Sequence, residues 1–274
     1  MIRIICRDNL EVLQQIPDDS IDLIYIDPPF NTGKVQKRTS LKTVRDKKGS
    51  RVGFQGQRYS TKTLGTQAYS DQFDDLTAFL RPRMEEAYRV LKADGSLYFH
   101  IDYREVHYCK IMLDQIFGRD SFLNEIIWAY DYGGRTKKKW PPKHDNILFY
   151  VKNPASYTFN VDEIDRIPYM APGLVGKEKS ARGKLPTDTW WHTIVPTNGS
   201  EKTGYPTQKP LGILRRIIVA SSKPGDTVLD FFAGSGTTGA ACLELGRNCI
   251  LVDNNAEAIE TMKKRFGQDA ECSI

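Results

Sequence analysis

The alternation of short apolar segments with amphipathic ones constrains the fold of this 274-residue chain more than any other feature. The candidate strands are residues 2–6, 23–26, 97–101, 126–130, 147–151, 228–231 and 250–252. The candidate helices, with apolar residues at helical spacing, are residues 10–16, 76–91, 105–117, 211–220, 238–245 and 256–266. Strands that alternate with helices form a mostly parallel sheet covered by helices, so we predict a doubly wound α/β fold. Pro82 should kink or interrupt its helix.

Two segments, residues 31–71 and about 132–206, break this alternation, apart from the strand at 147–151. Both are rich in Gly, Pro, Lys, Thr and Ser. Loops longer than about 15 residues are uncommon in compact domains unless they bind something or act as lids. We therefore predict one domain, residues 1–274, with two inserted regions that contact the substrate.

Composition excludes several classes of protein. Charged residues make up 27% of the chain, and no apolar run approaches the roughly 18 residues of a membrane span. The N-terminal residues lack the layout of a secretory signal. The five cysteines have no C-x-x-C spacing, and the four histidines form no metal-binding pattern. We expect a cytoplasmic protein with reduced cysteines, no metal and no membrane partner.

The net charge of +5 is modest, but its distribution is uneven. Residues 31–66 contain ten basic side chains and a single acid, Asp46. A second basic run occupies residues 135–143. Taken alone, a charged run is most often a solvated loop, so its position relative to other motifs must decide its role.

The first chemical motif, Asp27-Pro28-Pro29-Phe30, directly follows an apolar run. Open α/β sheets bind ligands at the carboxyl ends of their strands. The amine of an aromatic base is a poor nucleophile, because its lone pair is delocalised into the ring. Asp27 and a proline carbonyl could accept hydrogen bonds from such an amine and offset its developing positive charge, while Phe30 stacks on a flipped base. By itself the motif also fits a simple turn.

The second motif is a glycine turn after the strand at 228–231. Gly234, Gly236 and Gly239 match the dinucleotide fingerprint G-x-G-x-x-G, and Asp253 ends the next strand. An NAD-dependent oxidoreductase is therefore an alternative. A dinucleotide would need a second mononucleotide-binding half, for which the remaining chain is too short. An adenosyl ligand without phosphates fits better, with Asp253 accepting hydrogen bonds from ribose hydroxyls.

Together with the segment Tyr205-Pro206-Thr207-Gln208-Lys209-Pro210, these motifs resemble the β-class amino-group DNA methyltransferases over nearly the whole chain. In that family the Asp-Pro-Pro-aromatic tetrad comes first and the glycine motif last. The resemblance implies a Rossmann-like methyltransferase sheet with circularly permuted motif order, so the strands at 2–6 and 250–252 should be neighbours. It also implies S-adenosylmethionine as cofactor. The family usually has histidine where this chain has Tyr205, so we assign that position no catalytic role.

The resemblance further implies a set of cofactor-binding residues. Asp8 would contact the adenine of the cofactor, Lys209 would lie near its methionine end, and Asp253 would bind its ribose. The glycine motif adds Asp230, Phe231, Ala233, Gly234, Ser235, Gly236 and Thr237. In the alternative interpretation, Asp8 and Asp253 cap the helices that follow them, and Lys209 is a surface lysine.

The first basic run begins directly after the tetrad, which favours phosphate binding around a flipped nucleotide over an inert loop. The expected DNA-binding residues are Lys34, Lys37, Arg38, Lys47, Lys48, Arg51, Arg135, Lys137, Lys138 and Lys139. Phosphate contacts position a duplex without reading it, so we assign target recognition to residues 132–206. Trp190 and Trp191 in this region fit a core pair as well as they fit contacts with bases.

The predicted activity is methyl transfer to the N6 amine of a flipped adenine in double-stranded DNA, because adenine enzymes of this family usually begin the tetrad with Asp. Cytosine-N4 methylation is the near alternative, and an RNA or protein-glutamine substrate is more remote. A non-catalytic DNA-binding module would also explain the basic surface. The family resemblance adds two expected partners, a second copy of the chain and a cognate restriction endonuclease.

Overall fold

The computed structural model describes residues 1–32, 34–45, 50–52, 57–71, 73–134, 136–196 and 199–273. The chain forms two compact units. The main unit comprises Met1–Pro28 and Asp75–Ile274, and the hairpin unit comprises Pro29–Asp74.

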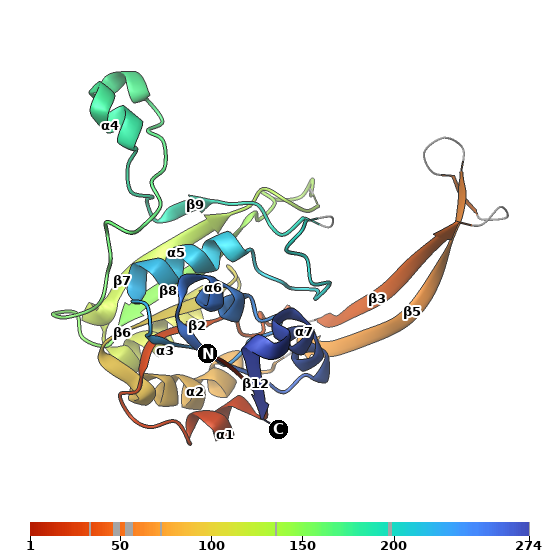
Figure 1. Ribbon diagram of the computed structural model, residues 1–274, viewed down its shortest axis with the longest axis horizontal. Coiled ribbons are helices and arrows are strands. Elements are labelled where there is room, and N and C mark those ends of the chain that lie inside the picture. Colours follow the sequence, from red (N-terminus) through yellow and green to blue (C-terminus); the bar gives the residue numbers. More distant parts are fainter. Residues whose placement is uncertain are drawn as a thin grey trace. The chain divides into compact units, whose positions relative to one another are not determined.

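The main unit is built on a mostly parallel sheet of nine strands, as the alternating pattern predicted (Figure 1). Its spatial order is β12-β1-β11-β10-β2-β6-β8-β7-β9, in which β8 runs antiparallel to both neighbours. The strands are β1 (Ile2–Cys6), β2 (Ile21–Ile26), β6 (Leu91–Ile101), β7 (Phe122–Ala129), β8 (His144–Val151), β9 (Thr189–Trp191), β10 (Thr227–Asp230), β11 (Asn248–Asp253) and β12 (Ala270–Ser273).

The N-terminal and C-terminal strands are neighbours in this sheet, which confirms the prediction from the permuted motif order. β1 pairs in parallel with β11, and Cys6 lies opposite Asp253. On its other side β1 pairs with β12. The pairing places the residue that follows β1 beside the glycine motif, although they lie at opposite ends of the chain.

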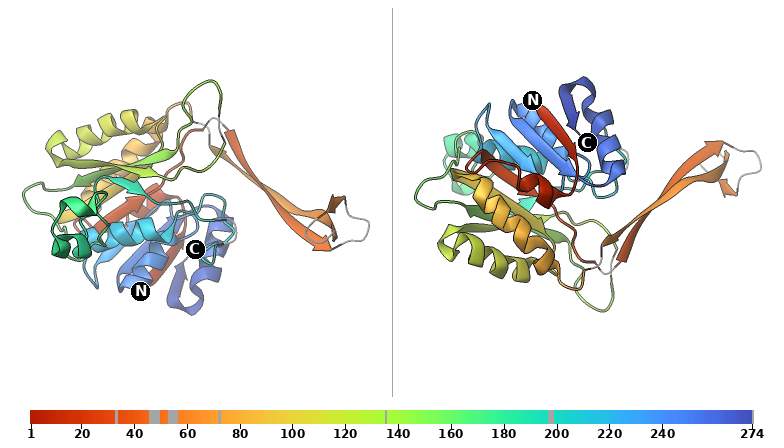
Figure 2. Two further views of the ribbon diagram at one scale, coloured as in Figure 1. Left: turned by 90° about the horizontal axis from the view of Figure 1, so that it is seen from above. Right: turned by 90° about the horizontal axis from the view of Figure 1, so that it is seen from below.

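Helices cover both faces of the sheet (Figure 2). α1 (Asn9–Leu13), α2 (Leu76–Val90) and α3 (Val106–Phe117) lie on one face, and α5 (Leu211–Ser221) and α6 (Thr237–Leu245) on the other. α7 (Ala256–Phe266) packs on β1 and β11. The remaining helical turns are η2 (Arg119–Ser121), η3 (Pro172–Leu174), α4 (Lys177–Arg182) and η4 (Gly267–Asp269). Within the described ranges, no helix is long and apolar enough to cross a membrane.

Pro82 does not interrupt α2, which was one of the two outcomes expected from sequence. The helix continues from Leu76 to Val90 as one element. A proline removes one backbone hydrogen bond and crowds the preceding turn. The buried residues Leu80, Met84 and Ala87 anchor the helix on both sides of that position, so apolar packing outweighs the local cost.

The hairpin unit contains strands where the sequence predicted a loop. β3 (Lys34–Arg45) and β5 (Arg58–Asp71) form a long antiparallel pair, and β4 (Arg51–Val52) adds a short third strand. The sequence of β3 and β5 has no apolar alternation, which is why the hydrophobic pattern missed them. It does contain frequent Thr, Val and Tyr and no proline, a composition that favours extended chain.

The region from 132 to 206 is partly ordered by the main sheet. β8 lies within it, and β9 adds its edge by pairing with β7. Trp190 is buried in the core, whereas Trp191 is 77% exposed, so the tryptophan pair divides between the two alternatives. All five cysteines are free.

Candidate active site

Polar side chains gather at the carboxyl edge of the parallel strands. Asp8 follows β1, Asp27 follows β2, His100 lies near the end of β6, Asp230 ends β10 and Asp253 ends β11. Neighbouring parallel strands present their carboxyl ends at one edge of a sheet, where α/β proteins place their ligand sites. The motifs found in sequence therefore share one edge.

Asp27 has two carboxylate oxygens in different environments. Lys209, just before α5, donates from Nζ to Oδ2 of Asp27 at 2.5 Å. The other oxygen, Oδ1, is buried and has no hydrogen-bond partner. The side chains of Asp27 and Lys209 are 16% and 13% exposed, so water screens their attraction only partly. One oxygen is thus fixed by the lysine, and the other can accept a hydrogen bond from a ligand.

His100 lies behind Asp27 and was missed by the sequence analysis. Its ring is fully buried, and Nδ1 lies 2.8 Å from the hydroxyl of Tyr25 and 3.9 Å from Oδ1 of Asp27. Nε2 lies 3.3 Å from Oδ2 of Asp145 on β8. Tyr130 donates to the second oxygen of Asp145 at 3.3 Å. A histidine inside the apolar run at 97–101 was the available signal, because buried polar groups need partners.

The pKa shifts fix the charge states of the groups that flank this ring. Burial, helped by the charge of Asp27, raises the pKa of Tyr25 well above its usual value, so its hydroxyl keeps its proton and can donate. Burial alone would raise the pKa of Asp145, but the hydrogen bond and the charge interaction with His100 outweigh burial and lower it. Asp145 is therefore a carboxylate near neutral pH.

The glycine turn is held by two aspartates, of which Asp230 is buried and Asp253 is half-buried. Asp230 accepts hydrogen bonds from the backbone N–H of Phe232 at 3.1 Å and from the hydroxyl of Thr238 at 2.5 Å. Burial raises the pKa of Asp230 to about 7. Asp253 accepts from the N–H of Gly234 and of Asn255, both at 2.8 Å. These bonds fix the turn between β10 and α6 against the end of β11.

Gly236 is required by packing against α7. Its φ of +72° is in the left-handed region, and a Cβ placed there would lie 2.8 Å from Cγ of Met262 and 2.9 Å from Phe266. A Cβ on Gly239 would lie 2.7 Å from Leu251 and 2.9 Å from Phe266. Gly236 therefore approaches α7 closely, and Gly239 approaches both α7 and β11.

Comparison with known proteins identifies the family of the chain. The family model described as DNA methylase matches residues 21–264 of the chain. The chain belongs to this DNA methylase family. Type II methyltransferase M.HpaI of Haemophilus parainfluenzae is 33% identical to this methylase over 267 residues, covering 97% of it and 74% of the relative. DNA adenine methyltransferase YhdJ of Escherichia coli K12 is 33% identical over 276 residues, covering 96% and 82%.

Solved structures share the fold of the methylase. The M1.HpyAVI–SAM complex aligns with a TM-score of 0.63 at 23% identity, covering 97% of the methylase and all of that chain. The cytosine-N4-specific PvuII DNA methyltransferase aligns with a TM-score of 0.67 at 16% identity, covering 97% and 86%. The prediction of a methyltransferase sheet is therefore confirmed.

The helix-capping alternatives can be judged one by one in the methylase. Asp8 caps α1 by accepting from the N–H of Leu10 at 2.9 Å, and it also pairs with Arg83 at 3.3 Å. Asp253 does not cap α7, because Asn255 does. Lys209 is not a free surface lysine, since its ammonium contacts Asp27. With these contacts in place, Asp8, Asp253 and Lys209 all lie at the carboxyl edge of the sheet.

The other residues predicted around the glycine motif are mostly buried in the methylase. The buried ones are Phe231, Ala233, Ser235 and Thr237. Tyr205 is also buried, and its ring would lie 3.3 Å from a Cβ on Gly234. These side chains are packed within the protein, and their contact with a cofactor stays a prediction. In the part of the chain that the structure describes, no cluster of His, Cys, Asp and Glu could hold a metal ion.

The predicted DNA-binding residues fall into three groups. Lys137, Lys138 and Lys139 are exposed in the segment between β7 and β8. Lys34, Lys37 and Arg38 lie on β3 and Arg51 on β4, whereas Lys47, Lys48 and Arg135 lie outside the described residues. Pro29 and Phe30 of the tetrad begin the hairpin unit.

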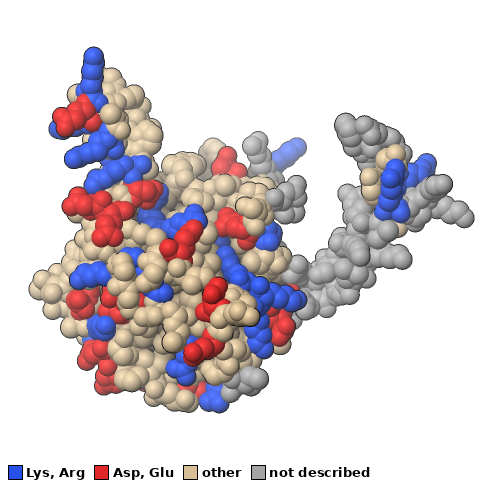
Figure 3. All heavy atoms as spheres, viewed as in Figure 1, with Lys and Arg blue, Asp and Glu red and all other residues tan. Residues whose placement is uncertain are grey.

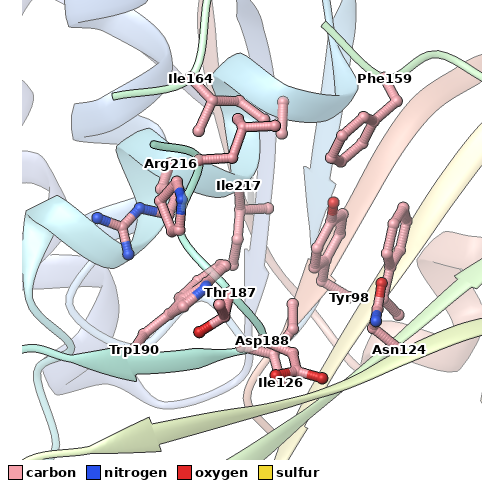
Figure 4. A pocket seen from close by; sticks show the side chains of 14 residues that line it. Tyr98, Asn124, Ile126, Phe159, Ile164, Thr187, Asp188, Trp190, Arg216 and Ile217 are labelled. Atoms are coloured by element: carbon pink, nitrogen blue, oxygen red, sulfur yellow. The ribbon is translucent and has the colours of Figure 1, made fainter. Parts of the chain in front are cut away.

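A cavity of about 420 Å³ lies apart from the predicted site residues, none of which is among those that line it (Figure 4). Tyr98, Phe149, Phe159 and Trp190 form much of its wall. Arg216 places its guanidinium 5.0 Å from the ring centre of Trp190 and is paired with Asp165. The cavity is lined by residues of α5 and of the segments at 159–164 and 185–188, and Asp27 is not part of it.

Proposed function

We propose that this DNA methylase transfers a methyl group from S-adenosylmethionine to the N6 amine of an adenine flipped out of double-stranded DNA. The observation that carries the proposal is the divided carboxylate of Asp27. Lys209 holds Oδ2, and the buried Oδ1 has no partner. A buried acceptor without a donor is costly to a protein, and an incoming amine would supply the missing donor.

The chemistry follows from this arrangement. Oδ1 of Asp27 and the carbonyl of Pro28 accept the two N–H bonds of the amine, which favours a pyramidal nitrogen with its lone pair directed at the methyl group. The negative charge of Asp27 offsets the positive charge that develops on the nitrogen. Phe30 stacks on the flipped base. When bound, S-adenosylmethionine supplies an electrophilic methyl group on a positively charged sulfur.

The residues at the carboxyl edge fit an adenosyl ligand. Each oxygen of Asp253 accepts one backbone hydrogen bond and retains a lone pair for a ribose hydroxyl. Because β1 and β11 are paired, Asp8 lies beside Asp253. The side chain of Asp8 is 43% exposed. We assign the ribose to Asp253, the adenine to the side of Asp8 and the methionine portion to the glycine turn and Lys209.

The choice of adenine over cytosine rests on two points. The tetrad begins with Asp, and the relative YhdJ is named a DNA adenine methyltransferase. The PvuII enzyme, which shares the fold, is named as cytosine-N4-specific. Asp27 would activate either amine in the same way, so the product must be identified directly.

DNA contact is assigned to the basic segments. Lys137, Lys138 and Lys139 are exposed, as are Lys177, Lys179 and Arg182 of α4. Figure 3 shows basic side chains, with some acidic ones, on the segment that carries α4. We propose that residues 132–206 read the target site and that residues 31–71 bind the phosphates. A second copy of the chain and a cognate restriction endonuclease are the proposed protein partners.

The test is to incubate the purified methylase with S-adenosylmethionine and unmethylated genomic DNA, digest the DNA to nucleosides and analyse them by mass spectrometry. N6-methyladenine supports the proposal. N4-methylcytosine would retain the mechanism and correct the base. The absence of both products, with cofactor binding demonstrated, would overturn the proposal of a DNA substrate.

A further inference from the structure

We propose that His100, held by Asp145, takes up through Asp27 the proton that the target amine loses during methyl transfer. The inference rests on the proposed function. His100 does not touch the base and acts through Asp27, so it is a positioning residue that also stores a proton.

The first support is the line of contacts behind the oxygen without a partner. Oδ1 of Asp27 is buried and faces Nδ1 of His100 at 3.9 Å. The opposite ring nitrogen, Nε2, faces Oδ2 of Asp145 at 3.3 Å. The imidazole therefore lies between two carboxylates, one at the reacting amine and one on a strand farther along the sheet.

The second support is the tautomer that the neighbours impose. The carboxylate of Asp145 can only accept, which places a ring proton on Nε2, and the hydroxyl of Tyr25, 2.8 Å from Nδ1, then donates to that nitrogen. The ring proton of neutral His100 is then on Nε2, where it points at the carboxylate of Asp145. The single lone pair of Nδ1 accepts from Tyr25 at rest, and it becomes available for a proton from Asp27 when the phenol O–H turns away from the ring.

The proton balance is complete without another reactant. The carbon–sulfur bond breaks and its electron pair stays on sulfur, while the lone pair of the amine forms the new carbon–nitrogen bond. The amine then carries an excess proton, which passes to Oδ1 of Asp27 and on to Nδ1 of His100. The hydroxyl oxygen of Tyr25 becomes the acceptor of that N–H. The carboxylate of Asp145 stabilises the imidazolium without taking its proton.

An imidazole suits this step because it is more basic than a carboxylate by roughly 2.6 pKa units in water. Uptake of the proton would return Asp27 to its charged form while the base still covers the site. Departure of the methylated DNA would then open the site for release of the proton to water.

Both acidic and basic groups surround the ring. The acidic groups near the site are Asp27, Asp145, Asp102 and Asp230, and the basic groups are Lys209 and Arg104. Arg104 is paired with Asp102, and Lys209 with Asp27. Asp145 has no paired lysine or arginine among the described ion pairs, which leaves its charge for His100. Trp128 packs edge-on against the ring at 5.6 Å and keeps that side dry.

The kinetic experiment compares the single-turnover rate of methyl transfer against pH for the wild type, His100→Gln and Asp145→Asn. We expect His100→Gln to lower the neutral-pH rate about a hundredfold and to abolish the loss of rate at acid pH that a protonated imidazole causes in the wild type. Asp145→Asn should lower the rate. It should also move the fall of the rate at acid pH to lower pH, because the imidazolium loses its carboxylate partner, while the binding of S-adenosylmethionine and DNA stays unchanged. His107→Gln, on the exposed surface of α3, is the matched control.

A loss of rate in His100→Gln that is equal at every pH, with the fall of rate at acid pH retained, would indicate a merely structural role and overturn the proposal. Wild-type rates in folded His100→Gln would overturn it as well. If His100→Gln does not fold, Asp145→Asn carries the kinetic test, because its side chain lies nearer the surface.

A second measurement does not depend on activity. Nitrogen-15 NMR of histidine-labelled methylase, which has four histidines, should show one buried ring in the Nε2–H form that changes when Tyr25→Phe removes the donor to Nδ1. An Nδ1–H form would overturn the proposal. If the wild type methylates no base, the proposed function fails, whereas an altered tautomer with intact methylation rejects this inference alone.

Discussion

The ammonium of Lys209 lies 2.5 Å from Oδ2 of Asp27, although the two residues are 182 positions apart in the chain. The contact joins the segment before α5 to the end of β2. It divides the carboxylate of Asp27 into a held oxygen and an oxygen without a partner. The two motifs that the sequence suggested separately therefore act as one unit.

Lys209→Met should reduce methyl transfer by about ten- to a hundredfold, because Asp27 loses the partner that fixes its orientation and its negative charge is left partly buried. Lys209→Arg should restore part of the rate. Single-turnover assays measure the effect, and Lys223→Met on the exposed surface is the control. Equal rates in Lys209→Met and the wild type would show that the ion pair has no part in catalysis.

Asp27→Asn should lower the methyl-transfer rate by about 10² to 10³, since the charge that offsets the developing cation is lost. The fold should persist, because Asp27 lies at the edge of the sheet and the change keeps the side-chain shape. Circular dichroism and product analysis measure these two outcomes. Asp162→Asn, at a side chain 96% exposed, controls for the substitution itself. Retained activity in folded Asp27→Asn would remove Asp27 from the catalytic group.

The stability of the wild type should fall as pH rises from about 4 to about 7 because of Asp230. Burial raises its pKa to about 7 in the folded protein, whereas an unfolded aspartate loses its proton near pH 3.9. Between these values the folded state binds more protons, so deprotonation favours unfolding, and the contribution levels off above pH 7. Asp230→Asn lacks this dependence. The free energy of unfolding of both proteins is measured in urea at each pH. As the pH rises from about 4 to about 7, the variant should gain a few kcal/mol of stability relative to the wild type. A difference that does not change with pH would contradict the assignment.

Gly236→Ala should destabilise the methylase more than Gly246→Ala does. Both glycines have nearly the same φ, +72° and +73°, so both substitutions carry similar backbone strain of about 1–2 kcal/mol. Only the Cβ on Gly236 meets Met262 and Phe266, which adds about 1–3 kcal/mol of overpacking. Urea denaturation of the two variants isolates the packing contribution. Equal losses would mean that α7 shifts freely to accept the methyl group.

Replacing Lys137, Lys138 and Lys139 together by alanine should weaken DNA binding and reduce its salt dependence. Each lost phosphate contact lowers the slope of log affinity against log salt by about 1. Binding titrations at several salt concentrations measure the slope. Replacement of Lys263 and Lys264, two exposed lysines on α7, provides the control for the loss of positive charge elsewhere on the surface. An unchanged slope would return the segment to an ordinary solvated surface.

The strands β1, β2, β6, β7, β8, β10 and β11, the helices on both faces of the sheet and the three sequence motifs could be predicted, because each depends on local pattern, whereas the short strands β9 and β12 could not. The apolar run before Asp27 and the glycines after β10 are readable along the chain. His100 and Asp145 were missed, since their meaning depends on the pairing of β6 with β8, which no local pattern specifies. The hairpin of β3 and β5 was missed because its register is set by backbone hydrogen bonds and not by apolar alternation.

The sequence by itself determined the family, the doubly wound fold and the adjacency of β1 and β11, because hydrophobic periodicity and motif order follow directly from residue identity. Only the tertiary structure decided which groups meet. Lys209 pairs with Asp27, Asn255 replaces Asp253 as the cap of α7, and His100 comes to lie between two carboxylates. Such contacts join residues from different strands and loops, and their distances are fixed by the packing of the whole sheet rather than by any one segment.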